Sequence, residues 1–166
     1  MPSVLLPSID PFIIRGAIDS DLPLVLAIEQ SVHSHPWKQS HFESSLHNKN
    51  LFYVVEIVNE SKEKEIVGYG IISFGGGESE LLNIAVAKQH QGKSIATMLL
   101  NFLVDQVREC AEGVFLEVRE SNLPAQQLYE KLGFNQVGVR PNYYPASSKH
   151  AGGREDAFIF ALTIFS

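Results

Sequence analysis

The chain has 166 residues, of which 45% are hydrophobic and 19% are charged, and its formal net charge is −6. This composition is typical of one folded globular domain and excludes an intrinsically disordered chain. The acidic excess argues against a nucleic-acid-binding protein, because neutralising phosphates takes a surplus of Lys and Arg. It suits a cationic partner, such as a basic protein or a small amine.

Residues 1–10 contain two prolines and no basic cluster. We therefore expect a short leader, not a signal peptide, followed by a single domain at 11–166. The one cysteine, Cys110, excludes an internal disulfide and suits a cytoplasmic protein. No apolar run approaches the roughly 18 residues that a membrane-spanning helix requires.

The first half of the chain alternates strand-like and helix-like patterns. Helix patterns cover 19–33, with Asp19 or Ser20 as N-cap, and 35–47, which opens with a Pro-Trp turn. β-Branched and aromatic runs predict strands. These strands cover 11–18, 51–58, 66–74 and 79–87.

The second half begins with apolar residues spaced by three and four from Ile95 to Cys110. This spacing predicts an α-helix of about 18 residues, closed by Gly113, with Cys110 on its buried stripe. A second helix follows at 121–133, with Ser121 or Asn122 as N-cap and Gly133 as C-cap. The remaining strands cover 114–119, 134–144 and 154–165. The order predicts an α+β fold with a mixed, mostly antiparallel, seven-stranded sheet.

The loop between the strand at 79–87 and the next helix contains Gly92-Lys93-Ser94. It ends like the phosphate-binding loop of NTPases, G-x-x-x-x-G-K-[ST], but the first glycine of that pattern would fall at Ala87. The P-loop interpretation therefore fails. A strand–loop–helix junction still presents free N–H groups to an anion such as a pyrophosphate. From the loop alone, a plain turn capped by Ser94 stays open.

The same loop resembles the acetyl-CoA loop of the GNAT acetyltransferases, roughly Q/R-x-x-G-x-G/A. Here it runs from Gln91 to Ala96, with Ser94 in place of the central glycine. Further segments, spread from about residue 15 to 160, resemble the ribosomal-protein-alanine N-acetyltransferase subfamily (RimI). These are HPW at 35–37, LLNIAVA, FLEVRESNLPAQQLYEKLGF, RPNYYP and GREDAF. The resemblance implies a GNAT-like fold with helices on both faces of the sheet. It also implies an acetyl-CoA-dependent enzyme that acetylates the N-terminal alanine of a small-subunit ribosomal protein.

Two residues are the candidate catalytic groups. Glu117 interrupts an apolar strand, where a buried carboxylate is costly unless it is hydrogen-bonded or functional. It is the candidate base, and the alternative is a structural Glu paired with Arg119 or Arg140. Tyr129 is the candidate acid for the departing thiolate, and the alternative is a Tyr at the boundary of an amphipathic helix. The matches to LEVR and LYE favour the functional interpretation of both.

The resemblance also assigns the cofactor and acceptor contacts. Acetyl-CoA would be held by Ile84, Ala85, Val86, Gln91, Gly92, Lys93, Ser94, Ile95, Ala96, Thr97 and Asn122. Asn122 also suits a helix N-cap. The acceptor side would be formed by His35, Pro36, Trp37, Tyr143, Tyr144, Arg154, Glu155 and Asp156. The acidic pair could receive a cationic N-terminus; the alternatives are a solvated charge cluster at 154–156 and a core position for Trp37.

The six histidines lack the framework of a metal site, so no metal is expected. A buried Cys110 would be an inert thiol, which favours direct transfer in a ternary complex over an acetyl-cysteine. We expect a monomer or weak dimer that binds a basic ribosomal protein N-terminus, with no nucleic acid and no membrane contact. Two other functions stay open: acetylation of a different amine, such as another protein N-terminus or a polyamine, and a non-catalytic CoA-binding module impaired by Ser94.

Overall fold

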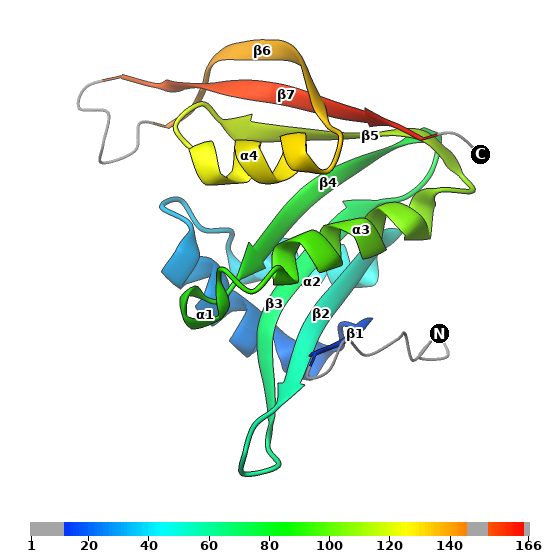
Figure 1. Ribbon diagram of the computed structural model, residues 1–166. Helices are drawn as coiled ribbons and strands as arrows, with labels where there is room; N and C mark the ends of the chain where they lie inside the picture. The colour runs from blue at the N-terminus through cyan, green and yellow to red at the C-terminus, as the bar shows by residue number, and fades with distance from the viewer. Residues whose placement is uncertain (1–11, 146–152, 165–166) are drawn as a thin grey trace.

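A seven-stranded sheet in the order β1-β2-β3-β4-β5-β7-β6 runs through the computed structural model (Figure 1), which describes residues 12–145 and 153–164. The strands are β1 (Phe12–Gly16), β2 (Asn50–Val58), β3 (Lys64–Ser73), β4 (Gly77–Val86), β5 (Ala111–Arg119), β6 (Asn135–Tyr144) and β7 (Glu155–Thr163). The helices are α1 (Leu22–Val32), α2 (Gln39–His47), α3 (Ile95–Val107) and α4 (Leu123–Lys131), with short 3-10 turns at Asp19–Asp21 and Lys88–His90. Every pairing is antiparallel except that of β4 with β5. The predicted α+β fold is confirmed, and the expected leader at 1–10 lies outside the described residues.

Two hydrophobic layers cover the two faces of the sheet. Side chains alternate along a strand, so Phe52 and Val54 pack with α1 and α2, whereas Val55 packs with the layer that contains α3 and α4. The helix α3 packs closely on the sheet at Gly70, where a Cβ atom would lie 2.6 Å from Leu103 Cδ1. None of the helices formed by the described residues is both long and apolar enough to cross a membrane.

The strands β4 and β5 form a short parallel ladder and then separate. Their register runs only from Gly77 opposite Ala111 to Glu80 opposite Phe115. Beyond this point β4 continues along β3, and β5 continues along β7, so a wedge opens between them (Figure 1). Among the described residues, no strand pairs with β4 on the side of this wedge from Leu81 onward. The topology therefore places an opening in the centre of the sheet.

Some local predictions were wrong. The helix α3 has 13 residues and ends at Val107, so Gly113 lies inside β5 and is no C-cap. Cys110 lies after the helix and is exposed, with its thiol donating to the Val107 carbonyl oxygen at 3.2 Å, so it is not a core thiol. The N-cap of α1 is Asp21, not Asp19 or Ser20. The Asp21 side chain is occupied by Arg15 and by the Ile18 N–H, and it makes no capping hydrogen bond to α1.

Candidate active site

Two cavities meet in the wedge between β4 and β5. The first, which we call the polar cavity, has a volume of about 710 Å³ and lies between the segment after α1, β4 and β5. The second, the loop cavity, has a volume of about 430 Å³ and lies between the end of β4, the loop before α3, and α4. Both are lined by Val32, His33, Ile84, Asn122, Pro124 and Tyr129. We call this shared boundary the junction.

The loop cavity is built for an anion. The loop turns through left-handed backbone at Gly92 (φ +79°) and Ser94 (φ +62°). The Gln91 side-chain amide donates to the Val86 carbonyl oxygen at 3.0 Å and ties the loop to β4. Ser94 occupies the N-cap position of α3, but its side chain makes no capping hydrogen bond, so the proposed serine cap is absent. The first N–H groups of α3 thus have no side-chain cap at the positive end of the helix.

Most predicted cofactor residues line the loop cavity. Those that do are Ile84, Ala85, Val86, Gln91, Gly92, Ser94, Ile95, Ala96, Thr97 and Asn122; Lys93 does not. Asn122 Oδ1 accepts a hydrogen bond from the Ala125 N–H at 3.2 Å, which confirms its predicted role as the N-cap of α4. The cavity combines a free strand edge with a helix N-terminus. A long thioester with a pyrophosphate matches both surfaces.

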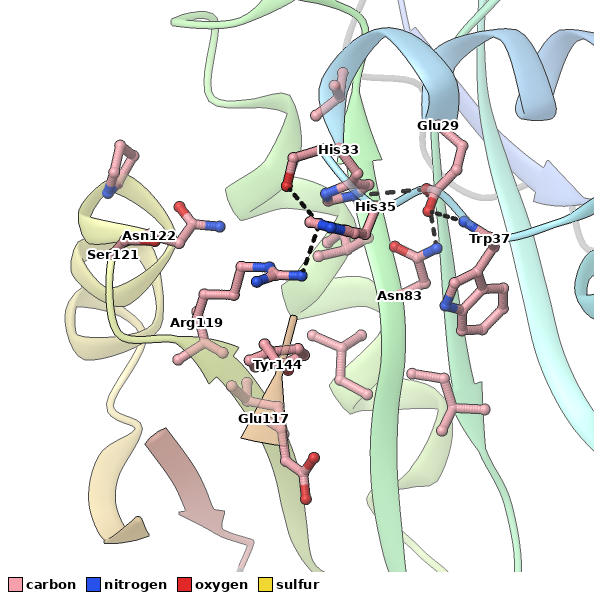
Figure 2. Close-up of a pocket in the computed structure, with 18 of the residues that line it drawn as sticks. Glu29, His33, His35, Trp37, Asn83, Glu117, Arg119, Ser121, Asn122 and Tyr144 are labelled. Atoms are coloured by element: carbon pink, nitrogen blue, oxygen red, sulfur yellow. Dashed lines mark hydrogen bonds and ion pairs between the residues drawn. The ribbon is translucent and has the colours of Figure 1, made fainter. Parts of the chain in front are cut away.

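A buried carboxylate, Glu29, anchors one wall of the polar cavity (Figure 2). Its Oε1 accepts from the Trp37 N–H at 3.0 Å. Its Oε2 accepts from the Tyr69 hydroxyl and, at 3.0 Å, from Asn83 Nδ2. Burial, reinforced by the charge of Glu29, raises the pKa of Tyr69, so this hydroxyl stays protonated. His33 Nε2 lies 3.5 Å from Glu29 Oε2.

Arg119 spans the mouth of the polar cavity. Its guanidinium stacks over the Tyr144 ring at 4.4 Å and contacts Glu155 Oε2 at 3.3 Å. Its Nη2 lies 3.1 Å from His35 Nδ1, which joins β5 to the segment after α1 (Figure 2). Burial, together with the nearby Glu117 charge, raises the pKa of Tyr144 to about 12. Sequence reasoning gave Arg119 no part in the site; its position two residues after Glu117, on the same strand face, was the available signal.

Glu117 lines the polar cavity but not the loop cavity. Its Oε1 pairs with Arg140 Nε at 2.5 Å, which is one of the two structural pairings considered from the sequence. Figure 2 shows its carboxylate directed away from Arg119 and His35. Burial first, and then repulsion from Glu117, raise the pKa of Glu80 on the adjacent strand.

Tyr129 lies at the junction, where the two cavities meet. It is buried, with its ring against Phe134 and Phe160 at centroid distances of 5.8 and 6.2 Å. Burial raises its pKa, so the hydroxyl stays protonated and can act only as an acid. The helix α4 holds it there through the Asn122 cap at one end and Gly133 (φ +96°) at the other.

The residues predicted for the acceptor side divide into two groups. His35, Trp37 and Tyr144 line the polar cavity, whereas Pro36, Tyr143, Arg154, Glu155 and Asp156 line neither cavity. Trp37 also packs on Phe42 at 5.2 Å, so its core role and its cavity role coexist.

The polar groups at 154–156 are used within the protein. Arg154 binds the carbonyl oxygens of Asn142 and Tyr143, and Asp156 accepts from the Asn142 N–H. Glu155 is buried and accepts from the Ser121 N–H at 2.6 Å. Burial alone would raise its pKa, but the hydrogen bonds from Ser121 and Arg119 lower it. Glu155 is therefore not free to receive an incoming ammonium group, and neither residue of the acidic pair lines a cavity.

Besides Arg119, three residues of the site were missed as candidates: Glu29, Asn83 and His33. Glu29 follows Val25 and Ile28 on the apolar stripe of α1, and an acid on a buried stripe was a usable signal. His33 was considered only as a metal ligand. Within 12–145 and 153–164 no three His, Cys, Asp or Glu side chains converge as a metal site. Cys110 lines neither cavity.

Comparison with known proteins gives a consistent result. Residues 22–134 match the acetyltransferase (GNAT) family. The chain is 36% identical over 146 residues to the [ribosomal protein bS18]-alanine N-acetyltransferase of Escherichia coli K12, covering 87% of this chain and 93% of that protein. It is 38% identical over 142 residues to the enzyme of the same name from Haemophilus influenzae, covering 85% and 91%. The crystal structure of the E. coli enzyme superposes with a TM-score of 0.81 at 35% identity, covering 93% of this chain and 95% of that one.

Proposed function

Because the chain belongs to the acetyltransferase (GNAT) family, we propose that it transfers an acetyl group from acetyl-CoA to the N-terminal alanine of ribosomal protein bS18. The observation that carries this proposal is the identity of 36% and 38% to two bS18-alanine N-acetyltransferases along nearly their whole lengths. Two cavities that meet at a buried tyrosine supply the matching architecture. The enzyme would work in the cytoplasm as a monomer or weak dimer, without contacting nucleic acid.

Acetyl-CoA, the acetyl donor, supplies a thioester carbonyl to the junction. The loop from Gln91 to Thr97 and the N-terminus of α3 would hold its pyrophosphate, although Lys93 does not line the loop cavity. The unpaired edge of β4 at Ile84–Val86 would bind its pantetheine arm by backbone hydrogen bonds. Asn122 shares the same wall.

The acceptor would enter through the polar cavity. A peptide α-amine has a pKa of about 7.7–8.0, against about 10.4 for Lys, so it needs little help to become a neutral nucleophile. Glu117 remains the proposed base, acting directly or through water, and Tyr129 the proposed acid. Because the cavities share the junction and Cys110 lies outside both, direct transfer in a ternary complex is the simplest route.

The polar cavity also discriminates between acceptors. It carries the cation of Arg119 beside its carboxylates, so a single ammonium is a better match than a polyamine with several positive charges. A CoA-binding module without turnover would have no use for a buried, protonated Tyr129 at the junction.

The test is mass spectrometry of a peptide panel after incubation with acetyl-CoA. The panel contains the bS18 N-terminal peptide, the same peptide starting with Ser, an N-terminally blocked version with internal Lys, and spermidine. We expect acetylation of the alanine peptide at its α-amine, with the blocked peptide and spermidine unmodified. Equal acetylation of spermidine and the alanine peptide would contradict the proposal, as would CoA binding without transfer to any acceptor.

A further inference from the structure

Among the described residues that line both cavities, only two carry a titratable side chain: His33 and Tyr129. They come from different elements, His33 from the end of α1 and Tyr129 from α4. Tyr129 is fixed as a proton donor. We propose that His33, oriented by Glu29, is a second proton acceptor for the incoming amine, in addition to Glu117. This inference rests on the proposed acetyltransferase function.

The geometry of His33 suits an acceptor. Its Nε2 is buried and makes no hydrogen bond in the described part of the chain, but it lies within ion-pair distance, 3.5 Å, of Glu29 Oε2. A ring with its Nε2 proton directed at a carboxylate keeps Nδ1 as a free lone pair. The side chain is 33% exposed, and Figure 2 shows its other edge facing the side of the cavity that carries Asn122. That edge faces the junction.

Glu29 can orient the His33 ring because its own carboxylate is held in one orientation by hydrogen bonds. The Trp37 N–H holds one of its oxygens, and Tyr69 and Asn83 hold the other. These three donors come from the segment after α1, from β3 and from β4, so the carboxylate is fixed by three elements. A carboxylate with a fixed position beside a histidine sets the tautomer of the ring and stabilises the imidazolium that forms.

Glu117 has a different place. Its carboxylate pairs with Arg140 and lines only the polar cavity. It would therefore meet the incoming amine inside the polar cavity, away from the junction. The cation of the same cavity, Arg119, is stacked on Tyr144, is held by Glu155 and contacts His35. With two proton acceptors, Glu117 and His33, the α-amine could lose a proton in either of two orientations.

The proposed step is balanced. The α-ammonium gives one proton to His33 Nδ1, and the nitrogen lone pair forms the new N–C bond. The C–S bond breaks, and the thiolate takes one proton from the Tyr129 hydroxyl. The nitrogen of the new amide then loses its second proton, which restores that of Tyr129 through solvent. His33 releases its proton to solvent as the one net proton of the reaction, so no oxidant or further reactant is needed.

The kinetic test compares His33→Gln with His47→Gln. His47 pairs with Asp19 on the surface and lines neither cavity, so it is a matched control. We expect His33→Gln to lower kcat about tenfold or more, with CoA affinity and the peptide KM nearly unchanged and the control like wild type. Added imidazole should raise kcat of His33→Ala but not that of wild type. A kcat of His33→Gln within about twofold of wild type would overturn the proposal, as would failure of imidazole to rescue His33→Ala.

A second measurement does not depend on turnover. The ring Cε1–H signal of His33 is identified in an NMR spectrum by its loss in His33→Gln. We expect CoA alone and the alanine peptide alone each to shift this signal and to leave that of His47 in place. If CoA does not shift the His33 signal, His33 is not at the junction and the inference fails. If wild type acetylates another amine instead of the alanine peptide, the function proposal fails, while the CoA shift and the kcat ratio on that amine still decide the role of His33.

Discussion

Tyr69 on β3 donates its hydroxyl hydrogen to the carboxylate of Glu29 on α1, and both side chains are buried. The two residues are 40 positions apart, so the bond joins the first helix to the centre of the sheet. Asn83 donates to the same oxygen. Because the wall of the polar cavity is built on Glu29, this bond connects the stability of the fold to the shape of the site.

Removing the hydroxyl should therefore destabilise the protein. Tyr69→Phe takes one donor from a buried carboxylate, and a hydrogen bond to a charged group contributes about 1.5–3 kcal/mol. We expect the free energy of unfolding in urea to fall by that amount. Tyr53→Phe is the matched control, since the Tyr53 ring packs on Phe102 and its hydroxyl makes no hydrogen bond within the described residues. Equal losses in the two variants would show that the bond to Glu29 contributes nothing specific.

Ser94 replaces the central glycine of the acetyl-CoA loop pattern. Its φ of +62° lies in the left-handed region, which costs a side chain with a Cβ about 1–2 kcal/mol, and its hydroxyl makes no cap that would offset this. We expect Ser94→Gly to raise the free energy of unfolding by about 0.5–1 kcal/mol, after the greater freedom of glycine in the unfolded chain is subtracted.

The matched control for this prediction is Ser94→Ala, which removes the hydroxyl and keeps the strained backbone. It should leave stability unchanged and should leave CoA affinity, measured by calorimetry, close to that of wild type. A loss of CoA affinity in Ser94→Ala but not in Ser94→Gly would mean that the hydroxyl binds the pyrophosphate and that the backbone strain is not the main feature.

The sequence predicted the elements well, because most of them are encoded locally. The stripe from Ile95 to Val107 and the N-cap at Asn122 depend on near neighbours, and both were found. The C-cap of α4 is Leu132, and the predicted Gly133 follows it in left-handed backbone. The end of α3 was missed because the apolar spacing continues to Cys110 after the chain has left the helix. Continued spacing cannot reveal where backbone hydrogen bonding changes to a turn.

The site was predicted less completely, because its decisive contacts are between distant segments. Glu155 was expected in the acceptor site, yet it binds the Ser121 N–H and Arg119, 34 and 36 positions away. Glu29 was overlooked for the same reason, because its partners Tyr69 and Asn83 lie on β3 and β4. A resemblance to a family transfers motifs, whereas the pairing of buried charges depends on the whole fold.

The buried Glu155 should make the free energy of unfolding depend on pH. Its pKa is lowered in the folded protein, because hydrogen bonds from Ser121 and Arg119 outweigh burial. A group with a lowered folded pKa stabilises the protein above its unfolded pKa of about 4.3 and loses that contribution as the pH falls through the folded value. Glu155→Gln should therefore lower the free energy of unfolding by about 1–3 kcal/mol at pH 7.

Denaturant titrations at several pH values check this prediction. The curves of wild type and Glu155→Gln should converge below about pH 4, where the wild-type carboxyl is itself becoming protonated. Glu130→Gln on the exposed face of α4 is the control and should follow wild type at every pH. A stability difference that stays constant down to pH 3 would show that the charge of Glu155 is not what stabilises the start of α4.

The proposed acid and base should differ in how they respond to mutation. Tyr129→Phe removes the proposed proton donor to the thiolate at the junction. We therefore expect kcat to fall about 100-fold and CoA affinity to stay unchanged. Glu117→Gln should also lower kcat, but by less, because His33 remains as an acceptor. The double variant His33→Gln/Glu117→Gln should lose more activity than either single variant. Stopped-time assays with the alanine peptide measure the rates of the three single variants and of the double variant. A double variant no slower than Glu117→Gln alone would show that the amine uses a single proton acceptor.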